Sequence, residues 1–196
     1  MAQLHLVRHT AVARHWSGRC YGQSDVPLSR EGREAAKSLA SRIAGLDVSR
    51  LYASPLRRAR YLAGLVSRAD QGIEIVLDAR LQECHFGGWE GSTWDAIYAE
   101  SGEAMMGLLH APGTFRPGGD GETTYLMRDR VLDWLNDALD DGAPIIAICH
   151  GGPIAAIRGT LSCAPVNRWP SLVPAYGEVV TLDVPAGWRA CAVQNP

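Results

Sequence analysis

An arginine and a histidine stand side by side near the start of the chain, directly after a short apolar run. Leu6 and Val7 precede Arg8 and His9. A cation beside a histidine at the end of a predicted strand indicates a phosphate pocket that contains its own nucleophile, because histidine can form a covalent phospho-intermediate. Three later segments could complete such a pocket: Ser54-Pro55-Leu56-Arg57-Arg58-Ala59, Leu81-Gln82-Glu83 and Cys149-His150-Gly151.

Phosphoryl transfer requires cations, a nucleophile in line with the leaving oxygen, and a proton for that oxygen. We expect His9 to be the nucleophile, held neutral because Arg8 and Arg58 oppose its protonation and lower its pKa. The same arginines would hold the equatorial phosphate oxygens. His150 would donate a further hydrogen bond as the phosphoryl group becomes planar, beside a helix N-terminus. Glu83 is the expected general acid, so burial or phosphate repulsion must favour its protonated form.

Each of these residues also has an ordinary structural interpretation. An Arg-His pair after a strand is usually a surface feature, Glu83 could be a loop carboxylate, and His150 could be a buried core histidine. The agreement among the segments favours catalysis at these positions. No metal or other cofactor is expected, because arginines and histidines supply the charge. In addition, His5, His9 and His15 lack the spacing of a known metal motif.

Composition limits the classes of protein to which the chain can belong. Its 196 residues, 46% hydrophobic and 20% charged, suit one compact α/β domain with a sizeable core. The formal net charge is -2, so neither nucleic acid nor an anionic membrane is expected as a partner. The five cysteines are dispersed without a Cys-x-x-Cys pair, which argues against a disulfide framework or a zinc site. With no signal peptide and no membrane-spanning apolar stretch, we expect a cytoplasmic protein.

Hydrophobic periodicity and end signals predict alternating strands and helices. The predicted strands are residues 3–8, 51–53, 73–77, 145–149 and a final hairpin-like pair at 179–184 and 188–193. Four main helices are predicted. The first has Ser29 as its N-cap, and the second has Ser54 as its N-cap and Pro55 in its first turn. The other two span 122–140 and 152–162. The helix at 122–140 should turn inward the side chains of Tyr125, Leu132, Leu135 and Leu139.

The alternation predicts a three-layer α/β/α sandwich with a mostly parallel central sheet, formed by residues 1–196 as a single domain. The continuous apolar run at 145–149 is typical of a central strand buried on both faces. Residues 84–121 are rich in Gly and Trp, and we interpret them as a small lid-like insertion with short helices near 92–100 and 103–110. Because ligands bind at the carboxyl ends of parallel strands, His9 and His150 should converge there.

These segments resemble the signatures of the histidine phosphatase superfamily, whose fold is phosphoglycerate mutase-like, and they follow the family order along nearly the whole chain. The segments that match are Arg8-His9-Thr10, Ser54-Pro55-Leu56-Arg57-Arg58-Ala59, Leu81-Gln82-Glu83, Phe86-Gly87-Gly88-Trp89-Glu90-Gly91, Pro117-Gly118-Gly119-Asp120-Gly121-Glu122 and His150-Gly151. The resemblance implies a metal-independent phosphomonoester hydrolase with a phosphohistidine intermediate, and a catalytic arginine at Arg58 rather than Arg57. Thr10 replaces the usual glycine, and His15 stands where many members have a phosphate-contacting asparagine.

The segment Gly18-Arg19-Cys20-Tyr21-Gly22-Gln23-Ser24-Asp25-Val26-Pro27-Leu28 is similar to the alpha-ribazole phosphatase branch of that superfamily. Those enzymes remove the 5′-phosphate from a nucleoside-like precursor in cobalamin assembly. The resemblance implies that the partner is a small phosphorylated metabolite, with alpha-ribazole 5′-phosphate as the expected substrate. An aromatic surface for its base would come from Trp16, Tyr21, Trp89 and Trp94. The residues expected to contact substrate are His15, Tyr21, Gly22 and Gly151.

Other functions fit the same signatures. The first alternative is a phosphatase of broad specificity, or one for sugar phosphates, phosphoglycerate or protein phosphohistidine. A mutase is less favoured, because the chain lacks the long insertions that hold and reorient a bisphosphorylated intermediate. The non-enzyme alternative is a pseudo-phosphatase that only binds a phosphorylated partner. Glu83 argues against it, because a binding module need not keep an acid. The sequence does not indicate the oligomeric state of the protein.

Overall fold

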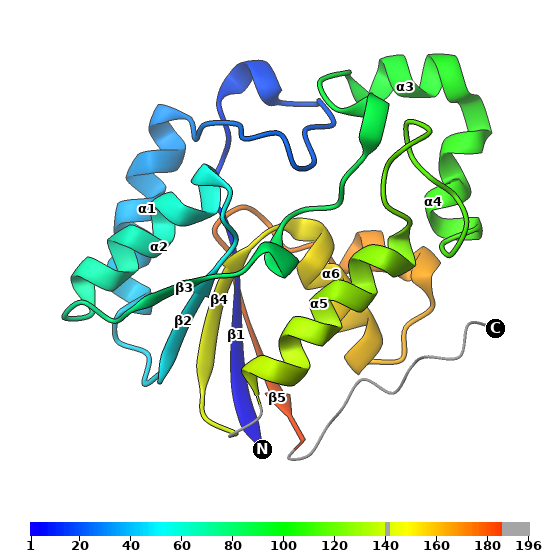
Figure 1. Cartoon of the computed structure of the whole chain (residues 1–196). Helices are drawn as coiled ribbons and strands as arrows, with labels where there is room; N and C mark the ends of the chain where they lie inside the picture. The colour runs from blue at the N-terminus through cyan, green and yellow to red at the C-terminus, as the bar shows by residue number, and fades with distance from the viewer. Residues whose placement is uncertain (140–141, 186–196) are drawn as a thin grey trace.

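A five-stranded sheet forms the centre of the computed structural model, which describes residues 1–139 and 142–185 (Figure 1). The strands are β1 (Ala2–Arg8), β2 (Arg50–Ala53), β3 (Ile75–Leu77), β4 (Ile145–Cys149) and β5 (Val179–Val184). Their order is β3-β2-β4-β1-β5, and β5 runs antiparallel to β1 while the other pairs are parallel. The sheet is therefore mostly parallel, as predicted. The strand predicted at 188–193 lies outside the described residues.

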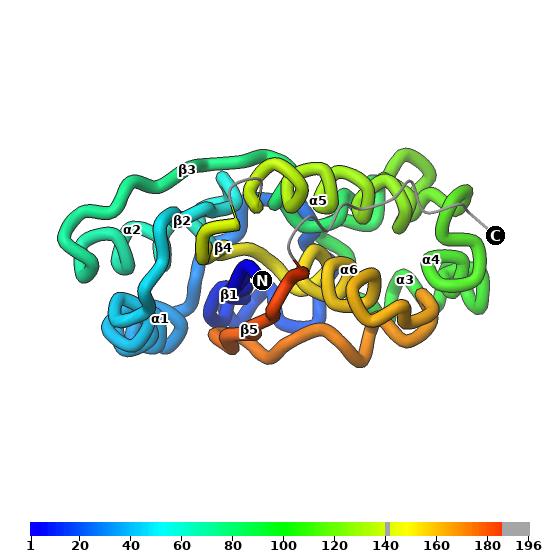
Figure 2. The backbone as a smooth tube through the Cα atoms, turned by 90° about the horizontal axis from the view of Figure 1, so that it is seen from below, coloured from blue at the N-terminus to red at the C-terminus, as the bar shows by residue number. Residues whose placement is uncertain are grey.

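Helices cover both faces of the sheet (Figure 2). On one face lie α1 (Arg30–Ile43) and α2 (Arg57–Ala69), and on the other α5 (Thr124–Ala138) and α6 (Gly151–Leu161). The side chains of β4 alternate between the two cores. Ile146 and Ile148 join the core under α1 and α2, whereas Ile145, Ala147 and Cys149 join the core under α5 and α6. This alternation confirms the predicted three-layer sandwich with the 145–149 strand at its centre.

The register of the central strands brings two histidines together. Arg8 at the end of β1 lies opposite Cys149 at the end of β4. The backbone N–H of His9 then donates to the Cys149 carbonyl over 3.1 Å, which extends the ladder by one step. His9 and His150 therefore leave the carboxyl edge of the sheet from neighbouring strands, and their ring centroids are 5.2 Å apart. The predicted convergence of the two histidines is confirmed.

Helix α2 begins later than the sequence predicts. Ser54 and Pro55 lie outside the helix and Leu56 is its N-cap residue, while the first helical N–H, that of Arg57, donates to Oδ1 of Asp25 over 2.7 Å. The predicted cap at Ser54 is wrong because the Ser54 hydroxyl instead lies 2.7 Å from Nε2 of His150. The later start places Arg58 in the first turn of α2, where the side chain is fully buried.

The inward face of α5 also differs from the prediction in one position. Leu132 and Leu135 are buried as predicted. Tyr125 is only half-buried, because its ring lies under the Arg128 guanidinium at 4.0 Å. The largest side chain that α5 buries is Trp134, which the periodicity did not single out. Tyr125, at the start of α5, thus packs along the helix, whereas side chains from the later turns of α5, such as Trp134, fill the core.

Residues 84–121 lie beyond the carboxyl ends of β1 and β4 (Figure 1). The helical elements of this segment are η3 (Gly87–Trp89), α3 (Trp94–Ser101), η4 (Gly102–Met106) and α4 (Gly107–His110). The other short 3-10 helices of the described chain are η1 (Arg14–Trp16), η2 (Ala79–Leu81) and η5 (Val166–Leu172). Across residues 1–139 and 142–185, no helix has the length and apolar character needed to cross a membrane.

Candidate active site

His9 is buried, with 1% of its surface exposed, directly beyond the end of β1. Its Nδ1 lies 2.8 Å from the carbonyl oxygen of Thr10. Because a carbonyl can only accept, Nδ1 carries the ring proton, and Nε2 is left with a lone pair. Burial, followed by the charges of Arg58 and Arg8, lowers the pKa of His9 to about 3, against an opposing contribution from the Thr10 carbonyl. The ring is therefore a neutral imidazole at physiological pH, with its nucleophilic nitrogen free.

Arg58 is fully buried and holds its guanidinium in one orientation. Its Nε donates to Nδ1 of His150 over 3.2 Å, Nη1 donates to the Ser24 carbonyl over 2.8 Å, and Nη2 donates to the Gly22 carbonyl over 2.5 Å. All of these partners are neutral atoms, so Arg58 keeps its positive charge beside the two histidines without a direct carboxylate contact.

His150 uses both of its ring nitrogens within this network. Nδ1 accepts from Arg58, so the ring proton lies on Nε2 and is donated to the Ser54 hydroxyl. Burial and the neighbouring Arg58 hold the pKa of His150 well below its usual range, so this ring is also neutral. The predicted hydrogen bond from His150 to a phosphoryl oxygen would require the Nε2–H to leave Ser54, and it stays a prediction.

Arg8 supplies the free donor of the site. Its Nη1 donates to the Pro174 carbonyl over 2.7 Å, and its guanidinium carbon lies 4.0 Å from the ring centre of Tyr176. Its Nε is buried and has no hydrogen-bond partner among residues 1–139 and 142–185. A side chain at Gly151 would approach Val173 to 2.9 Å and the Arg8 guanidinium to 3.5 Å, so glycine leaves room for this arrangement. An unpaired buried N–H on a cation is suited to an anionic oxygen such as that of a phosphate.

Glu83 lies at the N-terminus of α6. Its Oε1 accepts from the backbone N–H of Cys84 over 3.0 Å and of Gly152 over 3.1 Å. Arg130 fixes the backbone there, donating to the Glu83 carbonyl over 2.9 Å. These contacts hold the Glu83 carboxyl group in one position beside the first turn of α6. Its role as the general acid stays a prediction.

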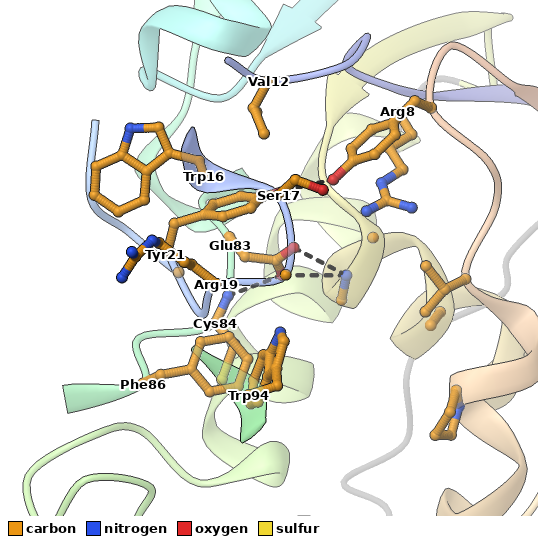
Figure 3. Close-up of a pocket in the computed structure, with 18 of the residues that line it drawn as sticks. Arg8, Val12, Trp16, Ser17, Arg19, Tyr21, Glu83, Cys84, Phe86 and Trp94 are labelled. Carbon is orange, nitrogen blue, oxygen red and sulfur yellow. Dashed lines mark hydrogen bonds between the residues drawn. The ribbon is translucent and has the colours of Figure 1, made fainter. Parts of the chain in front are cut away.

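A cavity of about 770 Å³ opens above these residues and is lined by Arg8, Glu83, Gly151 and Gly152. Six aromatic residues line it: Tyr176 and five others that we call the aromatic wall, namely Trp16, Tyr21, Phe86, Trp94 and Trp169. Figure 3 shows Glu83 between Arg8 on one side and the Phe86 and Trp94 rings on the other. The Phe86 and Trp94 ring centroids are 5.5 Å apart, nearly perpendicular at 87°. The cavity thus joins a charged end to an aromatic one.

Two tyrosines lie between the cavity and the buried His9. Tyr21 and Tyr176 both line the cavity, and their hydroxyl groups are 2.8 Å apart. The Tyr176 ring lies 5.5 Å from the His9 ring, and the Arg58 guanidinium lies 5.1 Å from the Tyr21 ring centre. His9, Arg58 and His150 lie behind this pair. We call Arg8, His9, Arg58 and His150 the basic cluster.

The structure brings most of the predicted site residues together. The basic cluster is contiguous, and Glu83, Tyr21, Gly22 and Gly151 line the cavity beside it. His15 is not brought there: it is exposed on η1, with its ring 5.6 Å from that of Trp16. Trp89 also turns away from the cavity, because it packs against Phe115 with ring centroids 5.8 Å apart.

Sequence reasoning missed several members of the site. Tyr176 belongs to an irregular segment without a motif, and no signal in the sequence would have identified it. Phe86 and Trp169 join the aromatic wall from segments whose direction the sequence does not define. Gly152 was detectable as the second glycine after His150. Within residues 1–139 and 142–185, no group of three or more His, Cys, Asp or Glu residues could hold a metal ion.

Comparisons with known proteins agree with this geometry. Residues 4–195 match the family model of the histidine phosphatase superfamily (branch 1). The chain is 33% identical over 180 residues to a glucosyl-3-phosphoglycerate phosphatase of Mycolicibacterium vanbaalenii, covering 87% of this chain and 78% of that protein. It resembles the solved structure of Bacillus stearothermophilus YhfR with a TM-score of 0.84 and 28% identity, covering 99% and 96% of the two chains. The alpha-ribazole phosphatase of Shigella flexneri has the same fold, with a TM-score of 0.80 and 21% identity over 94% and 91% of the chains.

Proposed function

Because the chain belongs to the histidine phosphatase superfamily (branch 1) and is a phosphomonoester hydrolase, we propose that it acts through a covalent phosphohistidine on His9. The state of the His9 ring carries this proposal. Thr10 holds the Nδ1 proton, which leaves the lone pair of Nε2 free for attack. Arg8, whose Nε is unpaired, stacks on the same Tyr176 ring that lies beside His9. A nucleophile and an anion-binding donor are thus available together.

In the first step, Nε2 of His9 attacks the phosphorus atom and the bond from phosphorus to the ester oxygen breaks. The attacking ring becomes positively charged, and the Thr10 carbonyl stabilises it by accepting from Nδ1–H. Arg8 and Arg58 balance the charge of the phosphoryl oxygens. Glu83 gives its proton to the departing oxygen, so that the alcohol leaves neutral.

In the second step, a water molecule gives a proton to the Glu83 carboxylate and attacks the phosphorus atom of phospho-His9. The N–P bond breaks, inorganic phosphate leaves, and the His9 ring returns to its neutral form with the proton on Nδ1. Glu83 is protonated again and ready for another cycle. The two amide N–H groups at Glu83 hold its carboxyl group in one position for both proton transfers.

The test is release of phosphate from an aryl phosphate in excess EDTA by the wild-type protein and by His9→Ala. We expect activity in the wild type and none in the variant, together with an acid-labile phosphoprotein when the wild-type reaction is quenched. Equal activity in both proteins would remove His9 as the nucleophile. Loss of wild-type activity in EDTA, restored by a divalent cation, would show that the arginines alone do not supply the required charge.

For the substrate, we propose a phosphomonoester with an aromatic leaving group, and alpha-ribazole 5′-phosphate as the compound to test first. The aromatic wall supports this choice, because its rings offer stacking surfaces to a benzimidazole. The experiment compares kcat/KM for alpha-ribazole 5′-phosphate with that for simple sugar phosphates. No preference for the aromatic compound would exclude this assignment and leave the hydrolase activity intact.

A second candidate substrate is glucosyl-3-phosphoglycerate. It is favoured by the name of the Mycolicibacterium relative, which is 33% identical to this chain. Arg14 and Arg19 line the cavity and would be available to the carboxylate of such a compound. Turnover of the two substrates by the same preparation decides between them. The second is supported if kcat/KM for glucosyl-3-phosphoglycerate exceeds that for alpha-ribazole 5′-phosphate.

A further inference from the structure

Glu90 is a carboxylate outside the cavity that accepts hydrogen bonds from four donors. It follows η3, and both of its oxygens accept hydrogen bonds. Oε1 accepts from the N–H of Gln23 over 2.9 Å and of Phe86 over 3.2 Å. Oε2 accepts from the N–H of Ser24 over 2.8 Å and from the Ser24 hydroxyl over 2.6 Å. Glu90 is not among the described residues that line the cavity, so its role must be sought in the segment that it holds.

The loop held by Glu90 is the loop that holds Arg58. Arg58 donates to the carbonyls of Gly22 and Ser24. The Gly22 carbonyl and the Gln23 N–H belong to one planar peptide group, whose two polar atoms point in opposite directions. Glu90 binds the N–H of that group and Arg58 binds its carbonyl. Fixing the first therefore fixes the direction of the second.

The close approach of Glu90 to the loop also explains the glycine at position 22. Gly22 has φ +36, in the left-handed region that favours glycine. A Cβ atom there would overlap Oε1 of Glu90 and lie 2.7 Å from the Cys84 carbonyl oxygen. The segment that carries Glu83 and Glu90 and the loop that carries Gly22 are thus in backbone contact.

Charge gives Glu90 a second reason to matter at Arg58. The guanidinium is fully buried, and its hydrogen-bond partners in the described chain are a ring nitrogen and two carbonyl oxygens, all neutral. A buried cation needs compensation. Glu83, Asp25 and Glu90 all place negative charge near the guanidinium, Glu83 most strongly. Glu90 acts across a single peptide group, and by polarising that group it strengthens the carbonyl as an acceptor.

We propose that Glu90 is a positioning residue, which sets the orientation of Arg58 through the Gly22–Gln23 peptide and thereby keeps His9 and His150 in a binding-competent arrangement. The part of this inference that concerns phosphate rests on the proposed function, because that function makes Arg58 a phosphate ligand. Nothing in the proposal requires Glu90 to touch the substrate.

The test uses Glu90→Gln, which keeps the shape of the side chain but replaces one acceptor oxygen with a donor. The matched control is Asp120→Asn. Asp120 accepts from the Gly88 N–H over 3.0 Å in the same segment, and no contact with the loop at 22–24 is recorded for it among the described residues. The measured quantity is the affinity of the whole chain for orthovanadate by calorimetry, with the folded state of each variant checked by thermal unfolding.

We expect Glu90→Gln to weaken vanadate binding by about tenfold or more, and Asp120→Asn to leave it within about twofold. A second readout is the protonation of the His9 ring followed by NMR. Release of Arg58 in Glu90→Gln should raise the pKa of His9 from about 3, since Arg58 is one of the charges that lower it. A purely structural role for Glu90 would lower the unfolding temperature and leave the His9 pKa unchanged.

A folded Glu90→Gln protein with wild-type vanadate affinity and an unchanged His9 pKa would overturn the inference. If Glu90→Gln does not fold, Glu90→Asp replaces it. The shorter carboxylate keeps its charge but cannot reach all the donors at Gln23, Ser24 and Phe86, and an intermediate loss of affinity is expected. The same data separate this inference from the proposed function. A wild-type chain that binds no vanadate refutes the proposed function, whereas tight wild-type binding with an unaffected Glu90→Gln variant refutes only the role of Glu90.

Discussion

The basic cluster and the aromatic wall meet at the Tyr21–Tyr176 pair and differ in how they are held. The members of the basic cluster follow β1 and β4 or lie in the first turn of α2, and each has a polar partner fixed by the backbone. Four members of the aromatic wall lie in or beside the short helices η1, η3, α3 and η5, and Tyr21 lies in the loop after η1. Phe86 and Trp94 hold each other by ring contact, whereas Trp169 donates to the Ala164 carbonyl over 3.0 Å.

This difference indicates that the basic cluster and the aromatic wall have different roles. Groups that must meet a phosphoryl oxygen within a few tenths of an ångström are fixed by sheet register and buried hydrogen bonds. Groups that select the leaving group are carried by segments without such constraints, where substitutions are tolerated. Changes in the basic cluster should therefore alter the chemical step for every substrate, and changes in the aromatic wall should alter KM for some substrates only.

The largest expected effect follows from Arg58→Lys. Lysine keeps the charge but cannot make the three contacts to His150, Ser24 and Gly22 that fix the guanidinium. We expect kcat/KM to fall by about 10²- to 10³-fold for all phosphomonoesters alike. The control is Arg57→Lys at the neighbouring exposed position, where activity should be kept. Equal losses at the two positions would contradict the assignment of the catalytic arginine to Arg58.

A smaller effect concerns stability against acid. The pKa of His9 is about 3 in the folded chain and 6.5 for an unperturbed histidine. Below pH 6.5, His9 therefore binds a proton in the unfolded chain but stays neutral in the folded chain. As a result, the stability conferred by neutral His9 is lost as the pH falls toward 3. Over this pH range, the unfolding free energy of His9→Asn should fall less steeply than that of the wild type. The two slopes should differ by about 1.4 kcal/mol for each pH unit.

Urea unfolding at several pH values measures this difference. The matched control is His15→Asn, since His15 is exposed on η1 and should leave the pH dependence as in the wild type. Trp94→Ala, a change in the aromatic wall, should lower stability by an amount that does not depend on pH. If His9→Asn has the same pH profile as the wild type, then His9 is not the buried neutral group that the structure describes.

Trp94→Ala tests the aromatic wall itself. Removing the ring takes away a stacking surface worth about 1.4 kcal/mol, so KM for 1-naphthyl phosphate should rise by about tenfold while kcat changes little. KM for glycerol 3-phosphate, which has no ring, should stay as in the wild type. Trp89→Ala is the control, because Trp89 packs against Phe115 rather than lining the cavity. A parallel rise in KM for both substrates would mean that Trp94 supports the fold of the segment and does not select the substrate.

The same contrast explains what the sequence could reveal. His9 and His150 were identified because apolar runs with the character of buried strands end just before them, and parallel register then requires that they meet. Arg58 and Glu83 were identified from the family resemblance, since no periodicity distinguishes them. The central position of the 145–149 strand followed from its uninterrupted burial. Wherever strand register decides position, sequence reasoning was sufficient.

Sequence reasoning did not predict where side chains in irregular segments lie. His15 and Trp89 were expected at the substrate, yet the turns that carry them direct His15 to solvent and Trp89 toward Phe115. Residue type gives no information about that direction, because backbone dihedrals in such turns are set by contacts far away in the sequence. Tyr176 shows the converse: it reaches the site because the N–H of Gly177 donates to the carbonyl of Arg8 over 3.1 Å.

The smallest expected effect comes from Tyr176→Phe. The wild-type Tyr21 and Tyr176 hydroxyls bond to each other in front of His9, and burial together with Tyr176 raises the pKa of Tyr21, so Tyr21 stays protonated. Phenylalanine keeps the ring under Arg8 but removes this bond, whose net contribution is about 1 kcal/mol. The pair should then open more often, and carbethoxylation of His9 by diethyl pyrocarbonate, followed by peptide mass spectrometry, should be about fivefold faster.

Tyr21→Phe breaks the same bond from the other side, so the double variant Tyr21→Phe/Tyr176→Phe should react with the reagent no faster than either single variant. Additive rate increases would mean that each tyrosine shields His9 independently, with no contribution from the bond between them. Unchanged rates in all three variants would mean that the rings alone cover His9. In either case the basic cluster would be separated from the aromatic wall by packing, and the phosphoryl group would reach His9 through ring movement that the hydroxyl pair does not control.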